Sequence, residues 1–143
     1  MKKKDIIAPV RAIRAFYHFM IMDLYGDAPI LARTPESGEV IDRKPRAEVA
    51  RWIEEELKTV IPLLTERNDA ETYGRPNKWM AEALLAKLYL NWGVYTCDDV
   101  TKVTNETSNN HEKLNDLVAV CDEIIESGIF EVGKGYRQKF FPN

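Results

Sequence analysis

The sequence predicts an all-α fold of tetratricopeptide-like antiparallel helix pairs, that is, two helical hairpins with long polar loops. Apolar residues recur at three- and four-residue spacings in four separate stretches of the 143-residue chain, which is the period of a helix with one apolar face. Between these stretches lie segments rich in Gly, Pro, Asn, Asp, Ser and Thr, which end helices and form loops. The length suits a single helical domain over residues 1–143.

The first stretch predicts a helix from Pro9 to Tyr25. The stripe expected to face the core comprises Val10, Ile13, Tyr17, Met20 and Leu24. Gly26 is expected to end the helix as a left-handed cap, and Pro29 prevents its continuation. The polar loop that follows, residues 30–45, is longer than the usual connection between helices, so it is either functional or disordered.

The second stretch predicts a helix from Arg46 to Leu64, with Pro62 disturbing its last turn. Its core stripe comprises Val49, Ile53, Leu57, Val60, Ile61 and Leu64. The charged residues between them, Glu54 and Lys58 included, are expected on a solvated face, where these two have the spacing of an ion pair.

The third stretch predicts a central helix from Pro76 to Tyr95. Apolar side chains fall on every side of it, and a helix that is apolar all round is buried. Pro76 suits the first turn, and Gly93 is expected near the exit. A polar loop, residues 96–110, follows.

The fourth stretch predicts a helix from His111 to Ser127, capped by Gly128. Its stripe comprises Leu114, Leu117, Val118, Cys121, Ile124 and Ile125. If the last two helices are antiparallel, Cys97 and Cys121 are too far apart to bridge, so two free thiols are expected, with Cys121 buried. An α-solenoid fragment and a four-helix bundle both fit this order of helices.

Catalytic chemistry is not indicated. His18 lies between aromatic residues on a predicted buried helix, as a core histidine does, and no nucleophile, zinc or phosphate-loop motif occurs. Asp98, Asp99, Asn105 and Glu106 supply hard oxygen ligands, but without the spacing of a calcium loop, so no metal and no cofactor is expected. The net charge of −3 gives no reason to expect a nucleic acid. The interpretation is a binding scaffold, not an enzyme.

Four blocks of the chain contain recognisable motifs in order. RAFYHFMIMDLYGDAPI (14–30) contains an L-Y-G-D-x-P run. VARWIEEELKTVIPLL (49–64), GRPNKWMAEALLAKLYLNWG (74–93) and AVCDEIIESGIFEV (119–132) follow it, and after the last of them comes YRQKFFPN (136–143) with a Y-x-x-x-F run. In these motifs and their order the chain resembles the SusD/RagB family of outer-membrane nutrient-binding lipoproteins of Bacteroidetes.

The resemblance implies a helical scaffold within a surface protein that holds glycans, or sometimes peptides, without hydrolysing them. Such proteins are anchored to the outer membrane by an N-terminal lipid and cap a TonB-dependent transporter of the SusC type. Family members are several times longer, so the chain is expected to be a fragment, and its aromatic tail with Phe140 and Phe141 fits an interrupted domain. As written, the chain carries no export signal.

Sugar sites combine aromatic rings with hydrogen-bonding side chains. On that basis the candidate ligand-binding residues are Arg33 and Asp42 in the first loop, and Asn91 and Trp92 near the end of the central helix. For each of them a structural role is the competing interpretation. The alternative function is a free-standing tetratricopeptide-like adaptor that binds a peptide or protein in a concave groove.

Overall fold

The described part of the computed structural model comprises residues 4–97, 101 and 110–130. Within it the secondary structure is helical, apart from one antiparallel bridge between Ala28 and Lys44. The helices are α1 (Lys4–Tyr25), α2 (Arg46–Val60), α3 (Lys78–Leu90), α4 (Trp92–Thr96) and α5 (Leu114–Glu126), with 3-10 turns at Ile61–Leu63 and Asn110–Lys113. Among the described residues, no helix combines the length and hydropathy that crossing a bilayer would need.

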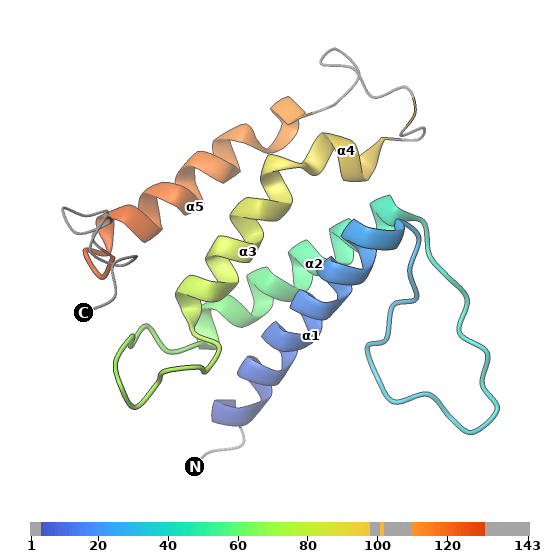
Figure 1. The fold of residues 1–143 in the computed structure, drawn as a ribbon, viewed down its shortest axis with the longest axis horizontal. Helices are drawn as coiled ribbons and strands as arrows, with labels where there is room; N and C mark the ends of the chain where they lie inside the picture. The colour runs from blue at the N-terminus through green and yellow to red at the C-terminus, as the bar shows by residue number, and fades with distance from the viewer. Residues whose placement is uncertain (1–3, 98–100, 102–109, 131–143) are drawn as a thin grey trace, which may run out of the picture.

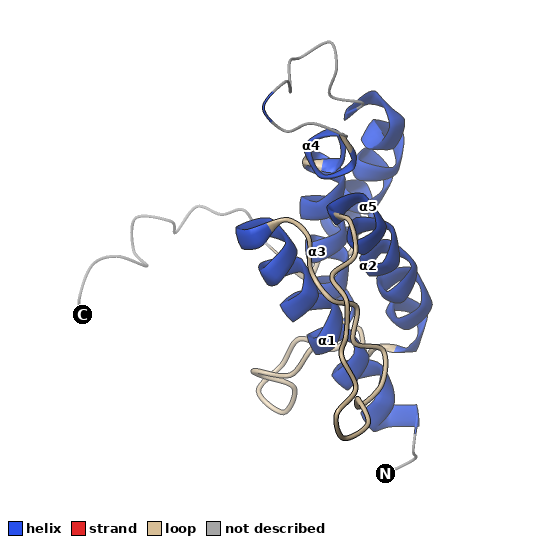
Figure 2. Ribbon diagram, turned by 90° about the vertical axis from the view of Figure 1, so that its right-hand side faces the viewer, coloured by secondary structure: helices blue, strands red, loops and turns tan. Residues whose placement is uncertain are grey.

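The long helices alternate in direction along the chain (Figure 1). Helix α1 packs mainly on α2, and α3 packs mainly on α5, while α2 and α3 join the two pairs. Figure 2, a view turned by 90° about the vertical axis, shows the same helices packed as a bundle. The loop between α1 and α2 projects from this bundle and runs beside α1. The predicted all-α arrangement of antiparallel helix pairs is therefore confirmed.

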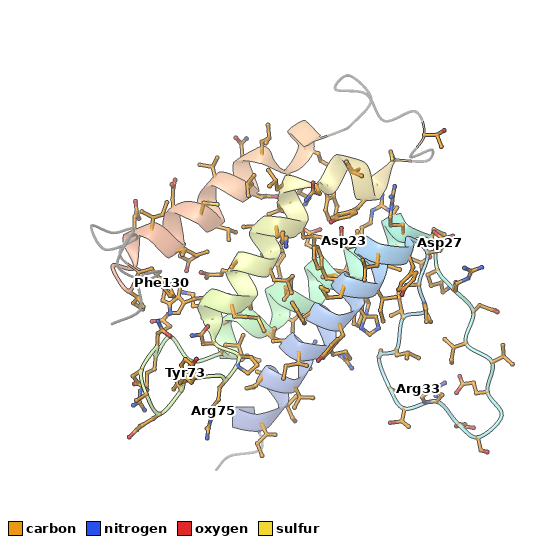
Figure 3. The ribbon with its side chains drawn as sticks, in the orientation of Figure 1. Asp23, Asp27, Arg33, Tyr73, Arg75 and Phe130 are labelled. Carbon is orange, nitrogen blue, oxygen red and sulfur yellow. The ribbon has the colours of Figure 1, made fainter. Side chains whose placement is uncertain are left out.

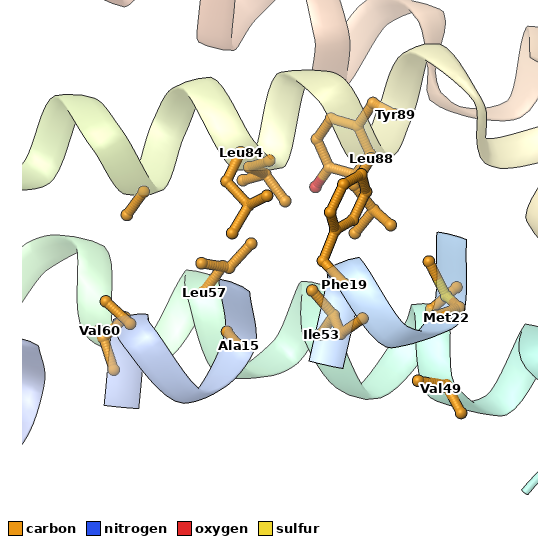
Figure 4. Packing of buried hydrophobic residues seen from close by; sticks show 14 of the residues in the cluster. Ala15, Phe19, Met22, Val49, Ile53, Leu57, Val60, Leu84, Leu88 and Tyr89 are labelled. Carbon is orange, nitrogen blue, oxygen red and sulfur yellow. The ribbon is translucent and has the colours of Figure 1, made fainter. Parts of the chain in front are cut away.

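The core lies between α1, α2 and α3 (Figure 4). The predicted stripe of α2 is confirmed except at Ile61, which is half-buried, because Val49, Ile53, Leu57 and Val60 are fully buried and Leu64 nearly so. Leu88 and Tyr89 of α3 meet this stripe together with Phe19 of α1. Each such side chain contributes about 1.5–3 kcal/mol by leaving water.

The predicted core face of α1 is wrong. Val10, Tyr17 and Leu24 are 58%, 60% and 67% exposed, and Ile13 and Met20 are 39% exposed each. The buried face instead comprises Ala8, Ala12, Ala15, Phe19 and Met22. Small alanine side chains let the backbones of α1 and α2 approach closely, which larger side chains at these positions would prevent.

The boundaries of the predicted helices also differ. Helix α2 ends at Val60 rather than Leu64, and α5 begins at Leu114 rather than His111, because 3-10 turns take the place of the missing residues.

Helix α1 begins at Lys4, so Pro9 lies inside it rather than at its start. Pro9 is in the second turn, where its missing N–H removes only one backbone hydrogen bond near a helix end.

The predicted central helix is divided at Asn91 into α3 and α4, and Gly93 lies within α4 rather than at an exit. The helix starts after Pro76, because the Asn77 side chain accepts a hydrogen bond from the Met80 N–H at 2.9 Å and acts as the N-cap.

Helix α5 is less buried than the regular spacing of its apolar residues predicts. None of its residues is fully buried, and Leu114, Val118 and Ile125 are 40%, 56% and 68% exposed. Cys121 is half-buried rather than buried, because α5 covers the outside of α3 instead of entering the core. Both cysteines are free, as predicted, and Gly26 and Gly128 adopt the expected left-handed conformation with φ of 79° and 67°.

Some predictions fall outside the described residues. These are the oxygen ligands Asp98, Asp99, Asn105 and Glu106, and the aromatic tail with Phe140 and Phe141.

Candidate functional site

The loop over residues 26–45 leaves the end of α1 and returns to the start of α2 (Figure 1). Its two ends are joined where Ala28 and Lys44 exchange backbone hydrogen bonds of 3.2 and 2.9 Å. Asp27 accepts a hydrogen bond from the Arg46 N–H at 2.9 Å, so a carboxylate from the first end of the loop caps the helix at the second. The mouth of the loop is therefore fixed, while residues 31–40 are all exposed.

His18 anchors this loop to α1. Its Nδ1 lies 2.8 Å from the Arg14 carbonyl oxygen, which can only accept, so Nδ1 carries the proton. Its Nε2 then accepts a hydrogen bond from the Leu31 N–H at 3.0 Å. The ring packs on Trp52 with 4.6 Å between ring centres. Because both ring nitrogens are engaged, His18 has a structural role, as the sequence predicted.

Arg33 and Asp42 lie on the exposed part of the loop. Arg33 forms a bidentate ion pair with Glu39, with N···O distances of 2.8 and 2.6 Å. The Glu39 carboxylate also accepts a hydrogen bond from the Glu36 N–H at 2.8 Å. The Arg33 guanidinium holds the pKa of Glu39 below its ordinary value. Asp42 is exposed as well. These side chains are available to a ligand, although Arg33 would have to share its donors.

Asn91 and Trp92 lie at the junction of α3 and α4, whereas Arg33 is on the projecting loop (Figure 3), so the candidates do not form one group. Trp92 is only 2% exposed, and its indole N–H lies 3.3 Å from Glu112. Its ring contacts Tyr89 edge-on, 6.2 Å between centres. With its faces covered, this indole cannot stack on a sugar. The Asn91 amide donates to the Lys87 carbonyl at 3.4 Å.

Two buried carboxylates of α2 are paired with cations. Burial alone would raise the pKa of Glu56, but hydrogen bonds from Arg11 and Arg14 of α1 outweigh it and lower the pKa. Glu54 was expected on a solvated face, yet it is 8% exposed.

The Glu54 carboxylate forms an ion pair with Lys58 at 2.7 Å, which confirms the predicted pair. It also forms an ion pair with Lys113 and accepts a hydrogen bond from the Tyr89 hydroxyl, at 2.9 Å each. Burial would raise the pKa of Glu54, and these hydrogen bonds overcome it and keep the group ionised. Neither Glu54 nor Glu56 is therefore a proton donor, and both stabilise contacts between helices.

Glu82 of α3 differs from them. It is 1% exposed, and neither of its carboxylate oxygens has a hydrogen-bond partner among the described residues. Burial, together with the nearby Glu123 of α5 and only partly offset by Lys78, raises its pKa to about 7. The sequence carries a signal for this burial, because Glu82 stands between apolar residues and alanines in the middle of the predicted central helix.

One hollow combines aromatic and amide side chains and so has the composition of a sugar site. It measures about 430 Å³ and is lined by Trp79, Phe130 and Asn77, among others. Two of its polar side chains are already engaged, however, because the Trp79 indole donates to the Glu66 carbonyl at 2.7 Å and Asn77 caps α3. No cluster of three potential metal ligands occurs in the described part of the chain.

Comparison with known proteins identifies the fold. A family model described as SusD-like, "Starch-binding associating with outer membrane", matches residues 3–90. The starch-binding protein SusD of Bacteroides thetaiotaomicron is 34% identical over 89 residues, which are 62% of this chain and 16% of that protein.

Two solved structures agree with the match. A SusD homologue from B. thetaiotaomicron superposes with a TM-score of 0.73 at 22% identity, over 95% of this chain and 25% of that one. A laminarin-binding SusD-like protein gives 0.65 at 23% identity, over 87% of this chain and 24% of that one. The chain thus spans about a sixth to a quarter of the length of these relatives, and the tetratricopeptide-like fold class is confirmed.

The family match begins with α1 and ends with the last residue of α3, so it includes the helices between which the core lies. Since it covers well over half of the 143 residues, the chain belongs to the SusD-like family of starch-binding proteins that associate with the outer membrane.

Proposed function

We propose that residues 1–143 form a single helical domain of a larger SusD-like protein, and that this domain is its non-catalytic scaffold. The whole protein binds a glycan at the cell surface and delivers oligosaccharide to a TonB-dependent transporter of the SusC type. An N-terminal lipid holds it at the outer membrane. The family match over residues 3–90 is the observation that carries this proposal.

The chemistry of the described residues supports a scaffold. The buried carboxylates Glu54 and Glu56 are neutralised by cations, most of which come from other elements of the fold, and both ring nitrogens of His18 are engaged. Such pairing fixes helices relative to one another and leaves no poised acid–base pair among them. Hydrolysis would need a pair of that kind.

The projecting loop is the part of this domain that we assign to the ligand. Arg33 and Asp42 are exposed and carry the donors and acceptors that sugar hydroxyls need. Trp92 and Asn91, by contrast, serve the fold, because the indole is covered and the amide is bound to the helix end.

Calorimetric titration of the complete gene product with starch and laminarin oligosaccharides tests this function. Binding is expected for the complete protein. Arg33→Ala or Asp42→Ala should weaken the affinity roughly 5- to 30-fold, which corresponds to the loss of one or two hydrogen bonds. Glu55→Gln, on the exposed face of α2, is the control and should bind like the wild type. Absence of glycan binding by the complete protein, or release of reducing sugar, would contradict the proposal.

The second candidate is a free-standing adaptor for a peptide, which the exposed apolar residues of α1 favour. Under that function the 143-residue chain alone would bind apolar peptides with defined stoichiometry and would bind no glycan in any context.

A further inference from the structure

The face of α1 opposite the core is apolar along the whole helix. We define the outer face as Ile6, Val10, Ile13, Tyr17, Met20 and Leu24, which are 48%, 58%, 39%, 60%, 39% and 67% exposed. Successive members are four and three residues apart, the spacing at which helices pack side by side in a coiled-coil seam. The buried face, which runs from Ala8 to Met22, repeats in the same way. Helix α1 therefore has two packing seams, of which only the alanine-rich one is occupied in this structure.

The outer face is a continuous exposed apolar surface, since its six members are each between 39% and 67% exposed. A contiguous apolar patch of this kind on a folded domain marks an interaction site. It contains no charged or amide group with which to bind a glycan. A helix that is apolar on both faces belongs in the interior of a larger structure.

A groove continues this face at its N-terminal end. The groove measures about 530 Å³ and runs from Ile6 and Val10 to Leu63 and Pro76. Arg75 lines the groove and lies on the same loop as Tyr73 (Figure 3). The Arg75 side chain has no hydrogen bond or ion pair to the described residues, so it is available to an acidic group on whatever fills the groove.

We infer that the outer face of α1 is covered by an amphipathic helix from the remaining part of the same SusD-like polypeptide. That helix presents aliphatic side chains to the seam and an acidic side chain to Arg75. The inference rests on the proposed function, in which residues 1–143 are one domain of a longer protein.

The length of the relatives favours this occupant over a second copy of the chain. The chain spans 16% of one relative and 25% of another, so most of a protein of that length is elsewhere in the same polypeptide. A covalently linked helix meets the seam at a high effective concentration. A second copy would instead have to overcome the loss of translational and rotational freedom.

The test compares one position in two contexts, the 143-residue chain and the complete gene product. Tyr17→Lys places a charge at the centre of the seam, and Leu90→Lys, at an α3 position 57% exposed, is the matched control. Tyr17→Lys should leave the Tm of the short chain within about 2 °C and lower that of the complete protein by about 5 °C or more. Leu90→Lys should be neutral in both.

A second variant measures coverage directly, in case the lysine prevents folding of the complete protein. Tyr17→Cys, in a background with Cys97→Ser and Cys121→Ser, should react with a maleimide at least about tenfold more slowly in the complete protein than in the short chain. Equal labelling rates in both contexts would overturn the inference. So would a defined dimer of the short chain, seen by sedimentation, that Tyr17→Lys abolishes.

The proposed function can fail separately. If the reading frame does not extend beyond these 143 residues, the scaffold proposal falls and the inference falls with it. If the complete protein exists and binds glycan, but Tyr17 is equally reactive in both contexts, only the inference is wrong.

Discussion

Replacement of Glu82 by glutamine should stabilise the protein in a pH-dependent way. The Glu82 carboxylate is 1% exposed and has no hydrogen bond to the described residues. The nearest cation is Lys78, whose Nζ lies 3.7 Å from one Glu82 oxygen but only 2.6 Å from Glu123. Lys78 therefore neutralises Glu123 more than Glu82.

Other charged groups near this site do not supply the missing partner. Lys58 and Asp116 line the same hollow of about 260 Å³, but Lys58 is paired with Glu54 at 2.7 Å and Asp116 adds a like charge. Glu66 takes a further share of Lys78 at 3.1 Å.

The sign of the effect follows from the raised pKa. The folded protein keeps the Glu82 proton up to about pH 7, whereas the unfolded chain loses it near 4.5. The folded state thus binds more protons between these values, so the free energy of unfolding falls as the pH rises through that window. From 4.5 to about 7, at about 1.4 kcal/mol per pH unit, the full loss is about 3 kcal/mol.

Glutamine keeps the shape of the protonated acid and cannot ionise. Glu82→Gln should exceed the free energy of unfolding of the wild type by less than about 1 kcal/mol at pH 5 and by about 3 kcal/mol at pH 8. Urea unfolding followed by circular dichroism at both pH values measures the difference. Glu55→Gln, on the exposed face of α2, should change stability by less than about 0.5 kcal/mol at either pH. The reasoning is refuted if Glu82→Gln and the wild type lose stability in parallel as the pH rises.

Three further substitutions test the assigned structural roles. His18→Phe removes the acceptor for the Leu31 N–H, so it should lower the free energy of unfolding by about 1–3 kcal/mol. It should also speed tryptic cleavage within residues 31–43, and an unchanged cleavage rate would show that His18 does not anchor the loop. Trp92→Ala should lower the free energy of unfolding, measured in urea, by about 3–5 kcal/mol, as loss of a core aromatic side chain does. The control Arg33→Ala should lower it by less than about 0.5 kcal/mol, and equal effects would place the indole outside the core. Arg46→Met removes hydrogen bonds to two carbonyls of α4 and should lower the free energy of unfolding by about 1.5–3 kcal/mol. Thermal unfolding measures this loss, and no loss would mean that α4 is held by packing alone.

The order and type of the helices could be predicted from periodicity, but the orientation of α1 could not. Its large apolar residues and its alanines both follow helical spacing, so periodicity alone offers two faces. Size suggested that Val10, Tyr17 and Leu24 were inside, whereas close packing on α2 requires the alanines there. The choice depends on how near the neighbouring backbone comes, which is a tertiary property.

The candidate site was predictable only in part. The long loop was found from its composition, and the core role of His18 from its aromatic neighbours. The break at Asn91 was missed, because the apolar pattern of α3 continues without interruption into α4. The burial of Glu54 was missed for a related reason, since its partner Lys113 comes from a segment 59 residues away.

Several residues of the motif that carries the family resemblance hold helix ends together. In the L-Y-G-D-x-P run, Gly26 turns the chain with a φ of 79°, and Asp27 caps α2. Just before the run, Asp23 accepts the Tyr95 hydroxyl of α4 at 2.6 Å. Gly26, Asp27 and Asp23 therefore join the ends of three helices, which gives these positions a structural role, whereas Tyr25 of the same run is 77% exposed. Under the proposed function, selectivity for a glycan depends on side chains that are not used to join helices, of which this domain offers those of the exposed loop.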